Sequence, residues 1–513
     1  MNKSNLIKGT IILTIAGLLT RIIGFFYRIF LSNAMGAELL GIYQLVFPVY
    51  GICFTIYASG LQTSISRMVA AQVGKGNYKN TKQILRIGIV MSFSLALLLT
   101  LIVSFNAEFI AVHLLNEPRT EESLHILSLV FPFCGITSCI NGYYYGLRKT
   151  AVPASTQLLE QVVRVIYVYC IVTILGKGEL EVTCELAAIG LVIGEVSSNI
   201  YNLLSLVITK PPKALLGTVK RCTTVTKETK SVAKELTLLT LPLTGNRLFL
   251  SLLHSFEAVL IPLMLKRYGL TSSEALSIFG ILNGMVMPFL MFPSAITNAL
   301  AVLLLPTISE AQSLGNDRQI SSTTSLAIKY SLIIGILSTG IFLIFGYYLG
   351  TTIYHNEMAG EYLRILSMLC PFLYLTTTLG SVINGLGKAH ITFINSIIGM
   401  TLRILLIVVL VPRYSTIGYV VSLVVSQLLI TLLDGRVIAK EAHFKLDSSN
   451  SLLKPFFIIF LSGIILLRIY EYFAKVTAIN DVLILMICCG ILCVVFLFFM
   501  FLWKAMSKKE FAR

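Results

Sequence analysis

The stretch ILSLVFPFCGITSCINGYYYGLRK, residues 126–149, recurs in altered form as ILSMLCPFLYLTTTLGSVINGLGK at residues 365–388. Both copies keep Ile-Leu-Ser, Pro-Phe, a Thr, Gly-Leu and a final Lys at a constant offset of 239 residues. The same offset places Gly76-Asn77 on Gly315-Asn316. Chance similarity between apolar helices would not hold one register across Pro, Gly and Lys. The chain is therefore predicted to contain two copies of one helical bundle.

The composition around this repeat is that of a membrane protein. The 513 residues are 56% hydrophobic and 12% charged, with a mean hydropathy of +0.85. Soluble domains carry about 25% charged residues, so most of this surface is expected to face lipid. A spanning helix needs about 20 mostly apolar residues. Fourteen stretches qualify: 8–32, 40–70, 86–106, 123–147, 157–176, 184–208, 236–266, 274–308, 325–347, 361–386, 393–411, 416–440, 452–472 and 480–504.

The predicted fold is all-α and polytopic, with two six-helix lobes and two further helices. The N-terminal lobe covers 1–208, a basic cytoplasmic linker covers 209–235, and the C-terminal lobe covers 236–440. Residues 441–513 supply the last two helices and a cytoplasmic tail. An even number of helices per copy gives both copies the same orientation. The lobes are then parallel repeats about an axis along the membrane normal.

The basic residues predict the orientation in the cell membrane. If the N-terminus is cytoplasmic, 26 of the 40 Lys and Arg residues fall in cytoplasmic segments and 7 in outer ones. The positive-inside rule therefore places both termini in the cytoplasm. The net charge of +16 does not indicate a nucleic-acid partner, because the charges sit in short loops between apolar stretches. Membrane lipids are the expected surroundings.

Three arginines lie in the first two predicted spans without a nearby acid. Arg21 and Arg28 are seven residues apart, which is two helical turns, so they share one face. The first span contains no acidic residue, and Arg67 in the second also has none nearby in sequence. An ionisable group at mid-bilayer costs at least ~2.5–3.5 kcal/mol on insertion scales, so it should meet a partner or a wet cavity.

Further charged residues lie in three other spans. Arg247, His254 and Glu257 fall on one stripe of the seventh helix. Glu160 and Arg164 have the i, i+4 spacing of an ion pair, and Arg403 lies at the place that the repeat makes equivalent to Arg164.

We interpret the surplus arginines as a binding site for an anion. A guanidinium group matches phosphate oxygens bidentately, so a phosphate or pyrophosphate group is the expected ligand. Two structural alternatives stay open: the arginines donate to backbone carbonyls, and Glu160 with Arg164 forms a purely structural pair. No catalytic constellation is present. We expect no enzymatic activity, no cofactor and no metal site.

Several short motifs are spread along the chain: Lys8-Gly9-Thr10, Thr20-Arg21-Ile22-Ile23-Gly24-Phe25, Ala58-Ser59-Gly60-Leu61, Glu160-Gln161-Val162-Val163-Arg164, Leu241-Pro242-Leu243-Thr244-Gly245-Asn246-Arg247 and Phe256-Glu257. With these motifs the chain resembles the stage V sporulation protein B and polysaccharide (lipid II) flippase family of the multidrug/oligosaccharidyl-lipid/polysaccharide exporter superfamily. The resemblance covers nearly the whole chain.

The resemblance implies two six-helix lobes plus two helices, and a role in spore cortex peptidoglycan synthesis. It also implies that Arg21, Arg28, Arg67, Arg247 and Glu257 line a central cavity. Gln62 stands where the family usually has Pro, and Arg67 where it usually has Lys. An acidic cation site that the family's relatives use in the seventh helix has no clear match, which puts sodium coupling in doubt.

The expected function is a flippase that moves a lipid-linked anionic oligosaccharide, lipid II-like, by alternating access. Three alternatives stay open. The chain could carry another lipid-linked polysaccharide, or exchange drugs for cations, which predicts a carboxylate-rich cavity. It could also be a non-transporting scaffold that recruits cell-wall synthases, for which removing the charges of Arg21 and Arg247 would leave function intact.

Overall fold

The computed structural model describes residues 3–75, 78–175, 182–208, 225–444, 447–476, 480–503 and 505. These residues are almost entirely helical and contain no strand, which confirms the predicted all-α membrane fold. In lipid, backbone polar groups must bond internally, and helices achieve this within one segment. Most of the predicted basic linker, 209–224, and the tail 506–513 lie outside the described residues.

The chain forms two compact units. The first comprises Met1–Tyr27 and Ala34–Leu263, and the second Arg28–Asn33 and Met264–Arg513. A six-residue piece of the first helix thus packs with the second unit. Residues 236–263, expected in the C-terminal lobe, pack with the first unit. The predicted lobe boundaries remain a proposal.

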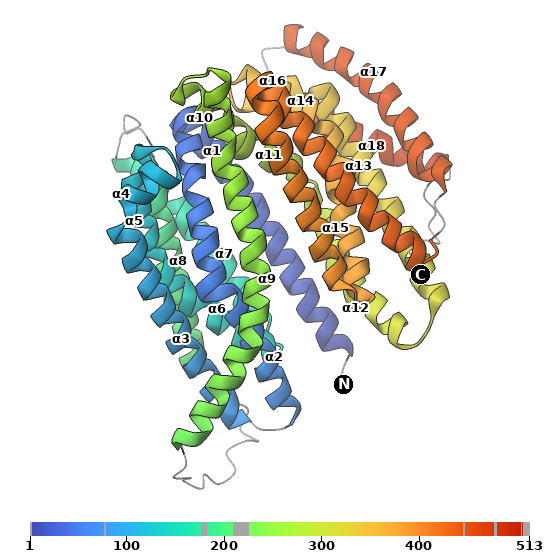
Figure 1. Ribbon diagram of the computed structural model, residues 1–513. Coiled ribbons are helices and arrows are strands. Elements are labelled where there is room, and N and C mark those ends of the chain that lie inside the picture. The colour runs from blue at the N-terminus through green and yellow to red at the C-terminus, as the bar shows by residue number, and fades with distance from the viewer. Residues whose placement is uncertain are drawn as a thin grey trace. The chain divides into compact units, whose positions relative to one another are not determined.

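The first unit is built from helices of uneven length. They are α1 (Lys3–Phe54), η1 (Thr55–Ser59), α2 (Gly60–Gly74), α3 (Tyr78–Phe105), α4 (Ala107–Phe109), η2 (Ile110–Leu114), η3 (Pro118–Thr120), α5 (Glu121–Ser128), α6 (Val130–Gly146), α7 (Ala151–Cys170), η4 (Ile171–Leu175), α8 (Cys184–Ile208) and most of α9 (Val225–Tyr268) (Figure 1).

The second unit is built from the helices after α9, together with the last residues of α9 and Arg28–Asn33 of α1. It comprises α10 (Ser272–Gly280), η6 (Ile281–Val286), α11 (Met287–Met291), α12 (Ser294–Ser313), α13 (Asp317–Ile353), α14 (Glu357–Leu366), η7 (Ser367–Leu369), α15 (Cys370–Gly385), α16 (Ala389–Glu441), η8 (Ser449–Leu453), α17 (Lys454–Val476) and α18 (Asp481–Leu502). The pair α17 and α18 packs on α13, where a side chain at Gly340 or Gly463 would collide with the facing helix.

The predicted count of fourteen spans is not confirmed. Within the described residues, eleven helices are long and apolar enough to cross a membrane, or up to twelve with the bent pair Pro118–Ser128 and Val130–Gly146. The stretch Ile12–Gly74 counts once, although its 63 residues at ~1.5 Å each far exceed a hydrocarbon core of ~30 Å. Non-helical backbone breaks it at Gly36 (φ 75°) and breaks α16 at Ser415 (φ 52°).

Hydrogen bonds repeat at the 239-residue offset. In the first unit Thr100 donates its hydroxyl to the Ser128 carbonyl at 2.9 Å. In the second, Thr339 donates to the Ser367 carbonyl at the same distance. The apolar cores also correspond, since Ile65, Val69 and Ile140 are replaced by Leu304, Ile308 and Leu379. Some internal contacts therefore recur in both copies.

Left-handed residues also recur at this offset. Asn116 (φ 55°) corresponds to His355 (φ 49°), and Arg148 (φ 60°) corresponds to Gly387 (φ 79°). These residues end helices, because a positive φ cannot continue a right-handed helix. The turns of the two copies are therefore alike although their side chains are not.

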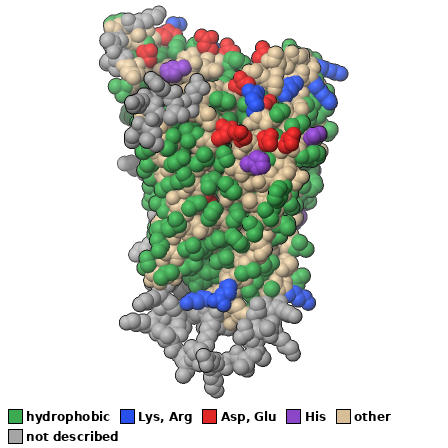
Figure 2. All heavy atoms as spheres, turned by 90° about the vertical axis from the view of Figure 1, so that its left-hand side faces the viewer, with side chains coloured by type: hydrophobic (Ala, Val, Ile, Leu, Met, Phe, Trp, Pro, Cys, Tyr) green, Lys and Arg blue, Asp and Glu red, His purple; other side chains and the backbone are tan. Residues whose placement is uncertain are grey.

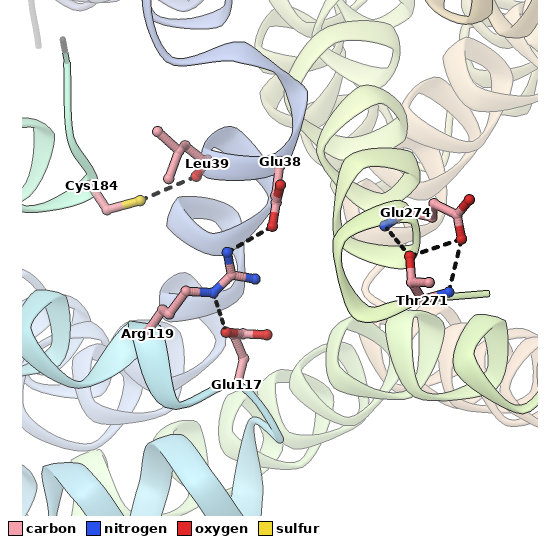
Figure 3. A network of polar contacts seen from close by, with 7 residues as sticks. All are labelled: Glu38, Leu39, Glu117, Arg119, Cys184, Thr271 and Glu274. Atoms are coloured by element: carbon pink, nitrogen blue, oxygen red, sulfur yellow. Dashed lines mark hydrogen bonds and ion pairs between the residues drawn. The ribbon is translucent and has the colours of Figure 1, made fainter.

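Polar contacts fix the ends of several helices (Figure 3). Arg119 Nη1 lies 2.7 Å from Glu38 Oε1, and its Nε lies 2.6 Å from Glu117 Oε1, so the loop before α5 is tied to the second half of α1. In the second unit Thr271 and Glu274 form a reciprocal capping box that starts α10. The face in Figure 2 has apolar side chains across its middle, with acidic and histidine side chains near one end and basic side chains near both ends. This pattern suits a lipid-facing surface.

Candidate functional site

The predicted arginines of the first two spans are exposed side chains on long helices. Arg21 lies in α1 and Arg67 in α2, both in the first unit. Neither has a hydrogen-bond or ion-pair partner among the residues that the structure describes. Each is therefore a guanidinium group that no described carboxylate neutralises, as the phosphate-binding interpretation requires.

Arg28 belongs to the other compact unit. The segment Arg28–Asn33 packs with the second unit, where Asn33 Nδ2 donates to the Ile353 carbonyl at 2.9 Å. Tyr354, the next residue, is buried and donates its hydroxyl to the Met285 carbonyl at 3.3 Å. Burial raises the pKa of the Tyr354 phenol, and the nearby positive charge of Arg28 opposes that rise. Arg28 thus lies beside the end of α13.

Arg247 contacts backbone within the first unit. Its Nη1 donates to the Ser59 carbonyl at 2.6 Å and lies 3.1 Å from the Ser59 hydroxyl. This contact matches the structural alternative raised above, donation to a carbonyl. The side chain remains exposed all the same. A guanidinium has five N–H groups, so one such contact leaves donors for another acceptor.

The other two residues of the predicted stripe on α9 differ in exposure. His254 is exposed, whereas Glu257 is 7% exposed. Close to them, Ser255 is buried and donates its hydroxyl to the Pro48 carbonyl at 3.0 Å. A polar contact therefore links α9 to α1 at this point. Unlike Arg247 and His254, Glu257 is buried.

Glu160 and Arg164 form the ion pair that their spacing predicts. The pair lies on α7, and the Arg164 side chain is only 15% exposed. Buried Glu195, from α8, interacts electrostatically with both residues. Its Oε1 and Arg164 Nε have no hydrogen-bond partner among the described residues. This cluster lies inside the first unit, so its setting differs from that of exposed Arg21, Arg67 and Arg247.

Arg403 occupies the corresponding place in α16 of the second unit. Its Nε donates to the Ser426 hydroxyl at 2.7 Å. In the second half of α16, beyond the break at Ser415, Asp434 is 2% exposed, and its Oδ1 accepts from Asn395 Nδ2 at 2.8 Å. Neither Asp434 nor Asn395 was singled out from the sequence. The offset of 239 residues, which maps Glu195 onto Asp434, was the signal that could have indicated a buried acid.

Comparisons with known proteins give the family. The family model "Polysaccharide biosynthesis protein" matches residues 6–312, and the MatE model matches 248–409. Stage V sporulation protein B of Bacillus subtilis (strain 168) is 29% identical over 474 residues, covering 92% of this chain and 90% of that protein. Lipid II flippase MurJ of the same organism is 24% identical, covering 83% and 82%.

Solved structures share the fold. The inward closed conformation of lipid II flippase MurJ superposes with a TM-score of 0.65 at 15% identity, covering 98% of this chain and 100% of that one. An inward-facing multidrug resistance MATE family transporter of the MOP superfamily gives 0.62 at 15% identity, covering 83% and 96%. The family match over more than half of the chain confirms the resemblance read from the motifs: this multi-pass membrane protein belongs to the polysaccharide biosynthesis protein family.

Proposed function

We propose that this protein is a flippase for a lipid-linked anionic oligosaccharide, a lipid II-like peptidoglycan precursor, in the cytoplasmic membrane. One observation carries the proposal. Arg21, Arg67 and Arg247 lie in membrane-length helices, are exposed, and have no carboxylate partner among the described residues. Such guanidinium groups suit a diphosphate, which offers several oxygens to planar N–H donors.

The relatives support the substrate class. A protein named lipid II flippase and a sporulation protein both align over more than four-fifths of the chain. We therefore propose that the precursor serves spore cortex synthesis, with Arg28, His254, Glu257, Glu160, Arg164 and Arg403 as further residues that contact substrate or support the site. Both termini are proposed to be cytoplasmic. An inside-negative potential then favours export of negative charge, by about 2.3 kcal/mol per charge per 100 mV.

Reconstitution tests the proposal. Proteoliposomes with the purified full chain receive fluorescent lipid II or a different lipid-linked polysaccharide, and the headgroup reaching the far leaflet is scored over time. Arg21→Ala, Arg67→Ala and Arg247→Ala should each slow lipid II transfer roughly tenfold or more, since a charge-assisted contact contributes about 1.5–3 kcal/mol. The matched control is Arg468→Ala, because Arg468, near the end of α17, is exposed but already pairs with Glu471 at 3.1 Å.

Each alternative has its own outcome. If only the other lipid-linked polysaccharide is transferred, the protein is still a flippase, but its proposed substrate is wrong. Unchanged transfer in all three variants would overturn the anion site and favour a scaffold that recruits cell-wall synthases. The MatE match over residues 248–409 favours a second candidate, a multidrug cation antiporter. That candidate requires drug efflux coupled to cations and no transfer of lipid II.

A further inference from the structure

The contact between Arg247 and Ser59 lies at an irregular point of the first unit. Ser59 ends the π-helical turn η1, where the helix begun in α1 passes into α2. A π turn disturbs the ordinary i→i−4 ladder, and such turns recur at functional sites. The Ser59 carbonyl accepts from two side chains here: the Thr63 hydroxyl at 3.2 Å and Arg247 Nη1 at 2.6 Å.

Close packing next to this contact fixes where α9 lies. The next residue is Gly60, and a Cβ added there would lie 2.0 Å from Thr244 Oγ1 and 3.2 Å from Thr240 Cγ2. Only a glycine lets α9 approach α2 this closely. Further along the same seam, a Cβ at Gly51 would lie 3.6 Å from Ser251 Oγ. The helix that carries Arg247 is therefore held against α1 and α2 on both sides of the arginine.

The contact uses one nitrogen of the guanidinium group. Arg247 Nη1 meets both Ser59 oxygens, and the structure gives Nε and Nη2 no partner among the residues it describes. Those two nitrogens form one edge of the planar group, with parallel N–H directions that match two oxygens of a phosphate. An arginine already fixed at one nitrogen loses less conformational freedom when it binds.

We infer that Ser59 and Gly60 are positioning residues for anion binding: they hold Nη1 of Arg247 so that its Nε–Nη2 edge is set to receive a phosphate group. This inference rests on the proposed function, in which Arg247 contacts the headgroup. It adds that the π turn and the glycine beside it determine how tightly Arg247 binds, although neither contributes a charge.

The test is a double-mutant cycle on reconstituted full-length protein with lipid II as the substrate. Gly60→Ala pushes Thr244 and α9 away, so it should raise the apparent KM for transfer roughly tenfold, equivalent to about 1.4 kcal/mol, with kcat little changed. Thr244→Ala removes the colliding hydroxyl and is the matched control with near-normal KM. Combining the two substitutions should restore most of the loss.

A second set of variants separates positioning from damage to the fold. In an Arg247→Lys background, which keeps the charge but lacks the guanidinium edge, Gly60→Ala should change KM no further. An equal loss in both backgrounds would overturn the inference, because the glycine would then act on packing alone. Ser59→Ala keeps the backbone carbonyl and loses only the 3.1 Å contact with Arg247, so it should raise KM by less than Gly60→Ala does. If Gly60→Ala does not fold, Ser59→Ala takes its place in the cycle. An unchanged KM in Arg247→Ala would instead overturn the proposed function together with this inference.

Discussion

The helix pair α7 and α8 in the first unit and the two halves of α16 in the second hold corresponding places in the repeat, yet their charges differ. In the first unit Arg164 pairs with Glu160. In the second, Arg403 donates to the Ser426 hydroxyl, and Gly399 stands where Glu160 would be. A Cβ at Gly399 would lie 2.2 Å from Ile430, so close helix packing has replaced the ion pair.

The buried acid, in contrast, is present in both copies. Glu195 is 5% exposed, and its counterpart Asp434 is 2% exposed. Asp434 accepts from the Asn395 amide, whereas Glu195 lies near the charges of Arg164 and Glu160. The duplication therefore kept an acid inside each unit and changed what balances it. Of the two corresponding helix pairs, as far as the structure describes them, α7 and α8 carry a cluster of two carboxylates and a guanidinium.

The largest expected difference between the units follows from Arg164. Arg164→Leu leaves Glu160 and Glu195 without their counter-charge, so the free energy of unfolding should fall by about 3 kcal/mol, the lower end for a broken buried pair. Arg403→Leu should cost about 1.5 kcal/mol, the lower end for a hydrogen bond that involves a charged group. Denaturant unfolding in detergent micelles measures both. Equal losses would mean that the two helix pairs are electrostatically alike.

The next effect concerns the donor to the second acid. Asn395→Leu removes the amide that bonds Asp434, so the free energy of unfolding should fall by about 2 kcal/mol, as for a buried acceptor left without its partner. At the corresponding place in the first unit, Thr156 donates to Asn202 Oδ1 at 2.8 Å. Thr156→Val should cost only about 1 kcal/mol. The same unfolding assay compares the two variants. A larger loss from Thr156→Val than from Asn395→Leu would contradict the idea that the bond to the buried acid is the stronger of the two.

Repeated close contacts should respond alike in the two units. A Cβ at Gly146 would lie 2.7 Å from Val69 Cβ, and one at Gly385 would lie 2.8 Å from Ile308 Cβ. Gly146→Ala and Gly385→Ala should each lower the free energy of unfolding by about 2 kcal/mol, because overpacking forces the facing helix to shift. If thermal unfolding shows one substitution tolerated and the other not, the repeat does not extend to backbone packing.

The smallest effect belongs to the repeated hydroxyl contacts. Thr100→Val and Thr339→Val each remove one hydrogen bond to a carbonyl. Interhelical hydrogen bonds in membrane proteins average about 0.6 kcal/mol, so each substitution should cost that much. Their combination should be additive, since the two bonds lie in different units. A non-additive double variant, measured by the same unfolding assay, would reveal coupling between the copies.

Much of the fold was predictable because hydrophobic length and the repeat are both properties of sequence. The offset of 239 residues also relates turns and hydrogen bonds that the structure shows in the two copies. The two breaks inside long helices differ in this respect. Gly36 is a residue type that suits a positive φ, whereas Ser415 at φ 52° is unusual, and nothing local indicated it.

The candidate site was predictable where a contact depends on spacing within one helix. Glu160 and Arg164 are four residues apart, and their pair forms. The partner of Arg247 was not predictable, because the hydrogen bond spans 188 residues and its acceptor is a backbone carbonyl, which every residue has. Glu257 was assigned to the same stripe as Arg247, but neighbouring helices, which periodicity ignores, decide its burial.

The recurring left-handed residues have a consequence for how the history of such a chain is traced. Arg148 and His355 occupy a conformation that glycine or asparagine would adopt with less strain, whereas their counterparts Gly387 and Asn116 suit it. The left-handed turn is thus present in both copies, although in each pair only one copy has the residue type that favours it. Distant copies of this bundle are therefore better aligned by anchoring on reversals of chain direction than on the apolar residues between them, some of which differ between the copies, as Ile65 and Leu304 do.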